Sequence, residues 1–498
     1  LDLVVVDSLE TALHTHFGWS RFRAGQRPVV EAVLSGRDAL AVLPTGGGKS
    51  LCYQLPALIR GGLVVVISPL VALMEDQVLQ LRRRGIAAAC LHAGLDPARR
   101  QQAMAALRDE SLRLLYLAPE RLQGEATQRL LETHAAEGRL VALAVDEAHC
   151  ISAWGHDFRP DYRRLGLIRR LCPGVPMLAL SATAAPRVRA DILRLLDLRS
   201  PLVQVSSARR ENLRYAMQRR PRDPMPQVLE ALEQSRGATL IYARTRRSVE
   251  HWAERLQGQS VEATPYHAGL DPATRQTALT QFLEQERPVL VATVAFGMGV
   301  DRGDVGLVLH LDLPSTPEGY LQESGRAGRD GQPARCLVLF SPGDRTSLGW
   351  AMQAAAGQGT TADERHRLDL AQQQLRRMEA VAEGEMCREQ ALLLAVGELV
   401  DPCGRCDRCS ASPKRKDWSR QATTLLTHLD DLDGTDMRRL GEHLALHETG
   451  QGERWTWLAR RLVQEELIRE SNDGVQRLQL RDSGRRYLER PWPLDFAA

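Results

Sequence analysis

A chain of 498 residues is too long for one hydrophobic core, and its length predicts three or four domains. Hydrophobic residues make up 43% of the chain and charged residues 26%, which is ordinary for a soluble globular protein. The longest apolar runs, such as residues 63–67, fall far short of the roughly 20 residues that span a bilayer, so we expect no membrane span. The net charge of +3 does not by itself indicate a polyanionic partner.

Short β-branched runs alternate with amphipathic helical stretches through the first 340 residues. The predicted strands are residues 39–43, 63–67, 114–117, 141–145, 177–180, 239–242, 289–292 and 305–310. This alternation is typical of βαβ units on parallel sheets. Eight or more strands make one continuous sheet improbable, so we expect at least two α/β units.

An internal repeat indicates where the two units divide. Residues 92–101 read HAGLDPARRQ and residues 267–276 read HAGLDPATRQ, with nine identities in ten positions at an offset of 175 residues. Both copies continue without a gap through a helical stretch into an apolar strand, which predicts the same α/β unit built twice. The shared Asp-Pro pair should begin a helix, with Asp as its cap and Pro in its first turn. We place the boundary near residue 205.

A glycine-rich loop follows the first predicted strand and precedes a helical run. Its glycines allow successive backbone N–H groups to turn toward one phosphate group. Lys49 would neutralise the β and γ phosphates of ATP, and Ser50 would ligate Mg²⁺. The strict form of this loop has glycine where this chain has Leu43. The predicted nucleotide-binding residues of the loop are Thr45, Gly46, Gly47, Gly48, Lys49 and Ser50.

Two carboxylates and two arginines complete the predicted catalytic set. Asp146 stands at the end of a predicted strand, where it would hold Mg²⁺ through water, and Glu147 would orient and deprotonate the attacking water. Arg326 and Arg329 are three residues apart in the second unit, which predicts one helical face turned toward the γ-phosphate when the cleft closes. The alternatives are a solvated acidic turn and a surface arginine pair.

Four of the nine cysteines are clustered late in the chain. Cys387 is followed by Cys403, Cys406 and Cys409, the last three at Cys-x-x-Cys-x-x-Cys spacing. Four thiolates around tetrahedral zinc is the expected arrangement, in a structural role, with iron–sulfur ligation as the alternative. The five other cysteines are scattered, and we expect reduced thiols in a cytoplasmic protein.

The sequence beyond residue 340 loses the strand pattern and becomes helical. After a short linker at residues 410–417, we predict helices at 421–432, 435–446 and 453–466, then a hairpin of residues 467–470 and 475–480 around Asn472-Asp473-Gly474. Three helices followed by a β-hairpin are typical of a winged helix. Its third helix offers Arg454, Arg460 and Arg461 as candidate phosphate contacts.

Taken together, these motifs resemble superfamily 2 helicases, and RecQ-type DNA helicases in particular. By this resemblance, Arg23 would stack on adenine, Gln26 would hydrogen-bond its edge, and Asp301 in segment 295–301 would contact the ribose. Residues 181–183 (Ser-Ala-Thr) resemble the motif that couples hydrolysis to movement. Residues 151–161, ISAWGHDFRPD, resemble the aromatic-rich loop of RecQ enzymes. Its DNA-contact candidates are Trp154, Phe158 and Arg159, which offer two stacking faces and a cation.

The resemblance implies an α/β fold with two tandem RecA-like domains at residues 1–205 and 206–343. A helical zinc-binding module at 344–411 and a winged-helix domain at 412–498 would follow. It also implies ATP-dependent 3′–5′ translocation on single-stranded DNA and unwinding of duplex junctions, in repair and recombination. We expect a monomer in the bacterial cytoplasm, associated with the nucleoid.

Three alternatives stay open at this point. They are an RNA helicase, a nucleic-acid-binding scaffold without ATP turnover, and a DNA translocase that does not unwind. The last is favoured by the short hairpin tip, which has no aromatic residue. Because the chain ends soon after the hairpin, we expect no additional C-terminal DNA-binding domain. Because residue 1 is leucine, whether the natural chain extends beyond either end stays open.

Overall fold

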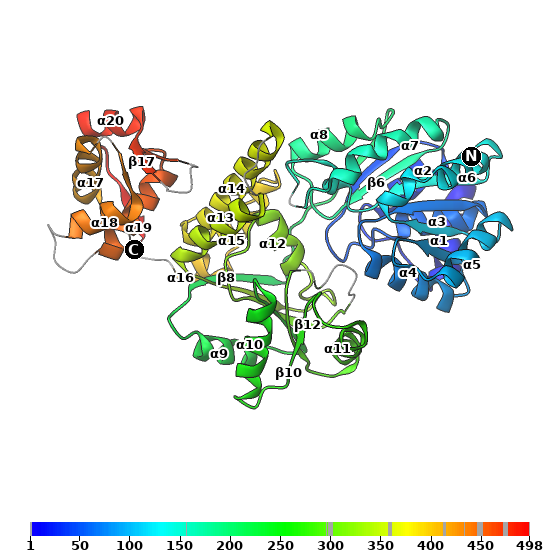
Figure 1. The fold of residues 1–498 in the computed structure, drawn as a ribbon, viewed down its shortest axis with the longest axis horizontal. Helices are drawn as coiled ribbons and strands as arrows, with labels where there is room; N and C mark the ends of the chain where they lie inside the picture. The colour runs from blue at the N-terminus through cyan, green and yellow to red at the C-terminus, as the bar shows by residue number, and fades with distance from the viewer. Residues whose placement is uncertain are drawn as a thin grey trace.

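The computed structural model describes residues 2–155, 157–294, 296, 302–356, 361–411, 415–432, 434–445, 452–471 and 477–497. Two α/β units lie next to each other, a helical module packs on the second, and a small C-terminal unit follows (Figure 1). Across these ranges, no helix combines the length and apolar character that a bilayer crossing requires.

The first unit is built on a parallel sheet, and the structure describes all its residues except Leu1 and His156, which lie outside the strands. Its seven strands run in the order β3-β4-β2-β5-β6-β1-β7. Alternate strand residues enter two separate cores, so each face of the sheet is covered by helices. The strands are β1 Ala39–Val42, β2 Leu63–Ile67, β3 Ala88–Leu91, β4 Leu114–Leu117, β5 Leu140–Val145, β6 Met177–Ser181 and β7 Leu202–Val205. The helices are α1 Asp2–Phe17, α2 Gln26–Leu34, α3 Leu51–Arg60, α4 Val71–Arg83, α5 Pro97–Arg108, α6 Glu125–Ala136, α7 Gly166–Leu171 and α8 Pro186–Leu195, with short 3-10 turns at Pro119–Gln123, Ala148–Ile151 and Pro160–Leu165.

The second unit repeats this architecture on a smaller scale. Its described residues form six parallel strands in the order β10-β11-β9-β12-β13-β8. The strands are β8 Leu213–Arg219, β9 Ala238–Tyr242, β10 Ala263–Tyr266, β11 Val289–Ala292, β12 Val305–His310 and β13 Ala334–Phe340. The helices are α9 Met225–Glu233, α10 Arg246–Gln257, α11 Pro272–Glu284 and α12 Pro317–Ser324.

The repeated sequence does form the same structure twice. Asp96 and Asp271 cap α5 and α11, accepting from the N–H groups of Arg99 at 2.9 Å and Thr274 at 3.0 Å. Each copy also places a buried histidine against a glutamate of the preceding helix. His92 lies 3.3 Å from Glu75, and His267 lies 3.1 Å from Glu250. All these pairs keep the offset of 175 residues.

The helical module shares its core with the second unit. Leu375, Met378 and Leu392 belong to the same buried cluster as Tyr215 and Phe340. Because this packing is continuous, the module and the second unit form one body. The module consists of α13 Pro342–Ala356, α14 Ala362–Glu383, α15 Arg388–Ala395 and α16 Asp407–Ala411.

The C-terminal unit has a core of its own. Its element order agrees with the predicted three helices and hairpin, and its described residues form one three-stranded and one two-stranded sheet. The predicted hairpin tip, Asn472-Asp473-Gly474, lies outside the described residues. The elements are β14 Arg415–Asp417, α17 Ser419–Asp431, β15 Thr435–Asp436, α18 Met437–Ala445, α19 Gly452–Gln464, β16 Ile468–Glu470, β17 Arg477–Leu480, α20 Asp482–Glu489 and β18 Asp495–Ala497.

Candidate functional site: an interdomain nucleotide cleft and its attached surfaces

The glycine-rich loop joins β1 to α3 as the sequence predicts. Gly46 and Gly48 adopt φ values of +81° and +73°, the left-handed region that favours glycine. A Cβ on Gly48 would lie 2.4 Å from Nε2 of Gln26, so a larger residue cannot occupy this position without displacing Gln26. The loop therefore presents backbone N–H groups, Lys49 and Ser50 to one cavity of about 800 Å³.

The two candidate adenine-binding residues contact this loop directly. Gln26 donates from Nε2 to the carbonyls of Gly47 (3.0 Å) and Gly48 (2.9 Å), and its Oε1 accepts from the N–H of Arg23 at 2.7 Å. The guanidinium group of Arg23 donates to the carbonyl of Gly46. Both residues line the cavity, and in this structure their polar groups are used by the loop.

The two carboxylates stand at the end of β5 on the cavity wall. Burial raises the pKa of Asp146 to about 7, and the neighbouring charge of Glu147 adds to this, while Lys49 and the backbone N–H of Glu147 oppose it. Glu147 has φ +47°, an uncommon value for a residue with a side chain. Such strain is typical of sites that orient a reacting group.

His149 connects Glu147 to the Ser-Ala-Thr segment after β6. Its Nδ1 lies 3.3 Å from Oε2 of Glu147 and 3.0 Å from Oγ of Ser181. Since Ser181 donates its hydroxyl proton to the carbonyl of Thr183 at 2.7 Å, its oxygen accepts from Nδ1–H of His149. His149 thus lies between the candidate base Glu147 and the Ser-Ala-Thr segment. The sequence motifs did not predict His149 as a site residue.

The arginines of the second unit line the opposite wall of the cavity. The predicted helical face is wrong: α12 ends at Ser324, and Arg326 and Arg329 lie in the turns beyond it. The reason is local, because Gly325 caps the helix and Gly328 has φ +55°. A Cβ on Gly46 would lie 3.5 Å from Cγ of Arg329, so the two units already approach closely at the loop.

Further residues line the cavity that the motifs did not single out. Trp19 stacks on Phe17 at 5.4 Å, with the guanidinium of Arg84 within 6 Å of both rings, giving an aromatic wall of the kind that holds a base. Gln322 and Asp330 line the side of the second unit. Asp301, the candidate ribose contact, lies outside the described residues.

The aromatic-rich loop is fastened to the catalytic segment. Arg159 donates from its backbone N–H to the carbonyl of Cys150 (2.9 Å), from its side chain to Asp157 (2.9 Å) and to the carbonyl of Pro69 (3.0 Å). Tyr162 donates its hydroxyl to the carbonyl of Asp146 at 3.0 Å. A displacement of this loop would therefore move the backbone of the candidate metal ligand.

Arginine side chains make cation–π contacts with the two aromatic rings of this loop, Trp154 and Phe158. The guanidinium of Arg187 lies 4.7 Å from the ring of Trp154, and the ring of His366 meets Trp154 edge-on at 5.9 Å. Arg163 lies 5.0 Å and Arg367 lies 5.7 Å from the ring of Phe158. His366 and Arg367 belong to α14, so the helical module reaches across to the first unit.

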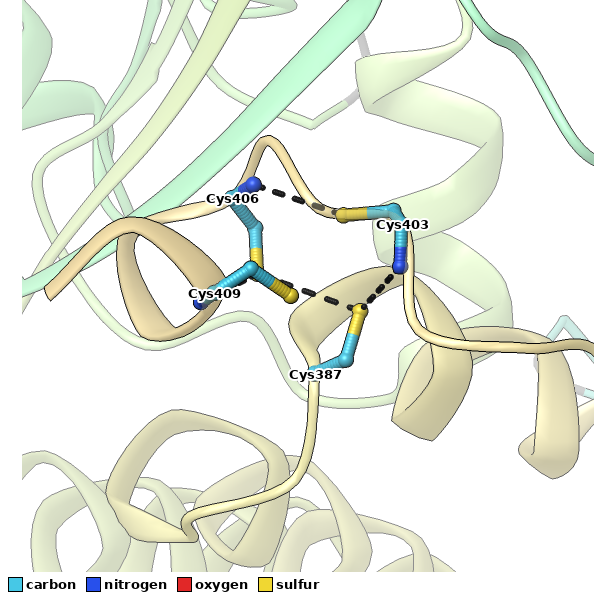
Figure 2. Close-up of side chains that lie close together, drawn as sticks. All are labelled: Cys387, Cys403, Cys406 and Cys409. Atoms are coloured by element: carbon cyan, nitrogen blue, oxygen red, sulfur yellow. Dashed lines mark hydrogen bonds between the residues drawn. The ribbon is translucent and has the colours of Figure 1, made fainter. Parts of the chain in front are cut away.

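The four predicted zinc ligands come together. One sulfur from each of four cysteines lies within 4.8 Å of all the others (Figure 2). Backbone N–H groups point at these sulfurs, including those of Cys403 to Cys387 at 3.2 Å and Cys406 to Cys403 at 3.3 Å. Although burial opposes it, the backbone N–H groups of Cys403 and Gln390 lower the pKa of Cys387. The donors fit a closed four-thiolate zinc site with a structural role. The ligands are Cys387, Cys403, Cys406 and Cys409.

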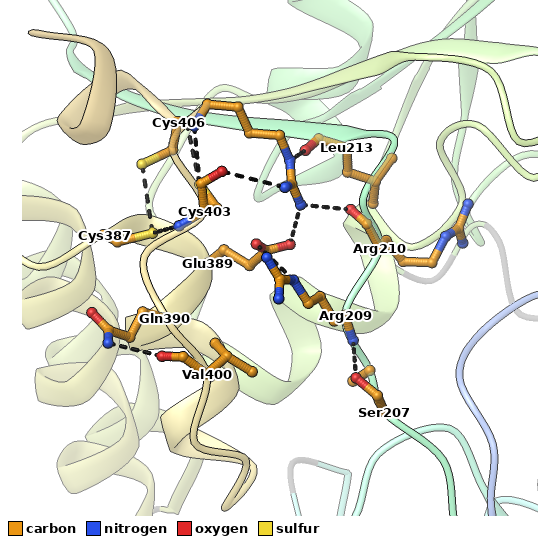
Figure 3. A network of polar contacts seen from close by, with 12 residues as sticks. Ser207, Arg209, Arg210, Leu213, Cys387, Glu389, Gln390, Val400, Cys403 and Cys406 are labelled. Atoms are coloured by element: carbon orange, nitrogen blue, oxygen red, sulfur yellow. Dashed lines mark hydrogen bonds and ion pairs between the residues drawn. The ribbon is translucent and has the colours of Figure 1, made fainter.

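The cysteine loop also holds the first strand of the second unit (Figure 3). The side chain of Arg405 donates to the carbonyls of Leu213 (3.1 Å) and Arg210 (3.2 Å) and to Glu389 (2.6 Å). Asp407 accepts from the N–H of Met217 at 3.0 Å. Zinc would therefore stabilise the junction between module and second unit.

The three arginines of α19 face protein. Arg454 lies 4.6 Å from the ring of Trp418. Arg460 forms ion pairs with Glu379 (3.9 Å) and Glu383 (3.5 Å) of α14, and Arg461 pairs with Glu385 at 3.3 Å. In this arrangement, Arg460 and Arg461 join the C-terminal unit to the helical module.

The chain was compared with known proteins. Three family models match in succession: DEAD/DEAH box helicase at residues 23–192, helicase conserved C-terminal domain at 223–331, and RecQ zinc-binding at 342–410. ATP-dependent DNA helicase RecQ of Pasteurella multocida is 38% identical over 87% of this chain and 66% of its own length. The same protein of Haemophilus influenzae is 39% identical over 82% and 64%. The chain thus spans less than two thirds of both relatives.

A Caenorhabditis elegans protein of the DNA helicase Q1 type is 35% identical over 90% of this chain and 70% of its own length. Two solved structures share the fold. Mycobacterium smegmatis helicase Lhr bound to single-stranded DNA has a TM-score of 0.56 at 17% identity, covering 97% of this chain and 61% of that chain. DEAD-box helicase Mss116 bound to single-stranded RNA has 0.56 at 15%, covering 79% and 90%.

Proposed function

This chain belongs to the RecQ family of DNA helicases, and from that premise we propose that it is an ATP-dependent DNA helicase. The observation that carries the proposal is a single cleft lined by Lys49 and Glu147 of the first unit and by Arg326 and Arg329 of the second. A triphosphate in this cleft would contact both units, so its hydrolysis would change how they sit together.

Each residue of the cleft has a proposed role in hydrolysis. The loop N–H groups and Lys49 hold the phosphates, Glu147 takes a proton from the attacking water, and His149 fixes the orientation of Glu147. Arg326 and Arg329 stabilise the charge that develops on the γ-phosphate. Magnesium, held by Ser50 and Asp146, would neutralise phosphate oxygens when bound.

The base and sugar of ATP would be held at the other end of the cleft. We assign adenine recognition to Arg23 and Gln26, which must exchange loop carbonyls for the base, and ribose contact to Asp301. Trp19 provides an adjacent aromatic wall.

DNA would contact the aromatic-rich loop and the C-terminal unit. A base stacked on Trp154 or Phe158 would displace the cations that now lie on these rings. Tyr162, which donates to the carbonyl of Asp146, would transmit the change toward that residue, while Arg159 offers its cation to DNA. The C-terminal unit is assigned as a winged helix. Arg454, Arg460 and Arg461 would reach phosphates only after leaving their present partners. Movement is assigned the 3′–5′ direction of the family, in repair and recombination.

The decisive experiment is a strand-displacement assay on tailed and forked duplexes of both polarities. We expect displacement with Mg²⁺ and ATP on a 3′ tail, ATP hydrolysis stimulated more by single-stranded DNA than by RNA, and loss of both in Lys49→Ala. Hydrolysis without displacement would instead identify a translocase, which the short hairpin tip favours. No DNA-stimulated hydrolysis would refute the motor assignment.

The cellular setting is assigned from the relatives. We propose a monomer acting at the bacterial nucleoid, because two of the relatives above are bacterial RecQ proteins. Sedimentation of the purified chain with and without forked DNA tests the monomer assignment.

A further inference from the structure

A small groove lies where the helical module meets the C-terminal unit. One face of α13 forms one wall, α14 forms the floor, and the end of β16 closes it. The groove has a volume of about 40 Å³, and nothing in the cleft or the zinc site uses it. The residues that matter are Arg345, Trp350, Arg376, Glu470 and Ser471.

Trp350 is exposed to an unusual degree for its type. Its exposed fraction is 61%, the largest of any tryptophan among the described residues, where Trp19 and Trp492 follow with 44% and 42%. An indole left in water forgoes the large stabilisation that burial of an aromatic side chain provides. Tryptophan is enriched at recognition surfaces relative to the rest of the protein surface.

Arg376 lines the same groove as Trp350. Arg376 is partly buried, and among the described residues it makes no hydrogen bond or ion pair. The charges of Glu470 and Glu379 act on Arg376, but both carboxylates are hydrogen-bonded by Arg345. A partly buried guanidinium that makes no hydrogen bond or close ion pair can still donate to an external anion.

We propose that this groove binds one unpaired nucleotide of a DNA junction, with the base stacked on Trp350 and a phosphate on Arg376. An aromatic face combined with a cation is the pair of groups by which proteins hold single strands. The site rests on the proposed helicase function. It adds a stacking surface beside the end of β16, on the tip side of the hairpin, whose tip sequence Asn472-Asp473-Gly474 has no aromatic ring.

The test compares Trp350→Ala with Trp350→Phe, which keeps a stacking face, and with Leu399→Ala, which removes another exposed apolar side chain of the module. Binding of a forked duplex is measured by fluorescence anisotropy, alongside strand displacement and ATP hydrolysis stimulated by single-stranded DNA. Trp350→Ala should weaken forked-duplex binding about 5- to 150-fold and slow displacement. Trp350→Phe should restore most of both, and Leu399→Ala should change neither.

Stimulation of ATP hydrolysis by a single strand should stay the same in all three variants, which separates this site from the motor. Arg376→Ala should lower the slope of log affinity against log salt by about 1. Unchanged forked-duplex affinity in Trp350→Ala would overturn the proposal. Absence of stimulated hydrolysis in the parent chain would instead count against the helicase function, while the affinity comparison still tests the groove.

Discussion

Arg345 forms the most buried ion pair that the described residues make between the helical module and the C-terminal unit. Its side chain is 10% exposed and donates to Glu379 of α14 at 2.8 Å and to Glu470 of β16. The two carboxylate side chains are 9% and 1% exposed. Among the described residues, the substitution Arg345→Ala would leave Glu470 with no ion pair within 4 Å and Glu379 with Arg460 at 3.9 Å.

The expected loss follows from this burial. Removing one partner of a buried ion pair costs about 3–5 kcal/mol, because the remaining charge stays desolvated. Arg460 partly compensates Glu379, so we expect about 3 kcal/mol from the stability of the C-terminal unit. A unit of this size unfolds in urea with a slope of about 1–3 kcal/mol per M, so the midpoint should fall by about 1–3 M.

Tryptophan emission is a suitable probe, because four of the eight tryptophans lie in this unit: Trp418, Trp455, Trp457 and Trp492. The matched control is Arg485→Ala, whose side chain is 57% exposed and pairs with Asp482, which is 95% exposed. An exposed pair of this kind contributes about 0–1 kcal/mol. Equal urea midpoints for the two variants would refute the assignment of Arg345 as a buried clamp.

Three further outcomes follow from the site. Arg329→Ala should lower kcat for ATP by about 10³- to 10⁵-fold while nucleotide binding changes little; a kcat within tenfold of the parent would remove this residue from catalysis. Cys406→Ser should release zinc, detectable with a chromogenic chelator, and destabilise the second unit through Arg405; retention of one zinc per chain would contradict the four-thiolate site. Arg367→Ala should reduce the single-stranded DNA concentration that half-saturates ATP hydrolysis about 2- to 5-fold, because only one of the two cations on the Phe158 ring, Arg163, remains; an unchanged or higher value would argue against competition for that ring.

The sequence alone predicted most of the nucleotide cleft and the zinc site. Local spacing defines both: a strand-loop-helix holds Lys49, a strand end holds Asp146, and Cys-x-x-Cys-x-x-Cys places three thiols together. The repeat correctly predicted two related α/β units, because both copies carry the same cap and proline.

The strands and contacts that the sequence did not predict have physical causes. Edge strand β3 reads Ala-Ala-Cys-Leu, which lacks the β-branched and aromatic residues that mark a strand, and β10 contains Pro265. The spacing of Arg326 and Arg329 suggested one helical face, but α12 ends at Ser324. Gly325 caps it and Gly328 has a positive φ, so both arginines lie in turns. Arg460 and Arg461 have a basic pattern that resembles a DNA-binding face, yet their partners are carboxylates about 80 residues away, which no local pattern reveals.

The shared core of the helical module and the second unit has a mechanical consequence. Since these parts move as one body, α14 acts as a rigid arm whose near end is set by the second unit and whose far end rests on Trp154 and Phe158 of the first. Any rotation of the second α/β unit relative to the first would shift His366 and Arg367 relative to the rings of Trp154 and Phe158. Opening or closing of the nucleotide cleft would therefore cover or uncover the aromatic rings of Trp154 and Phe158.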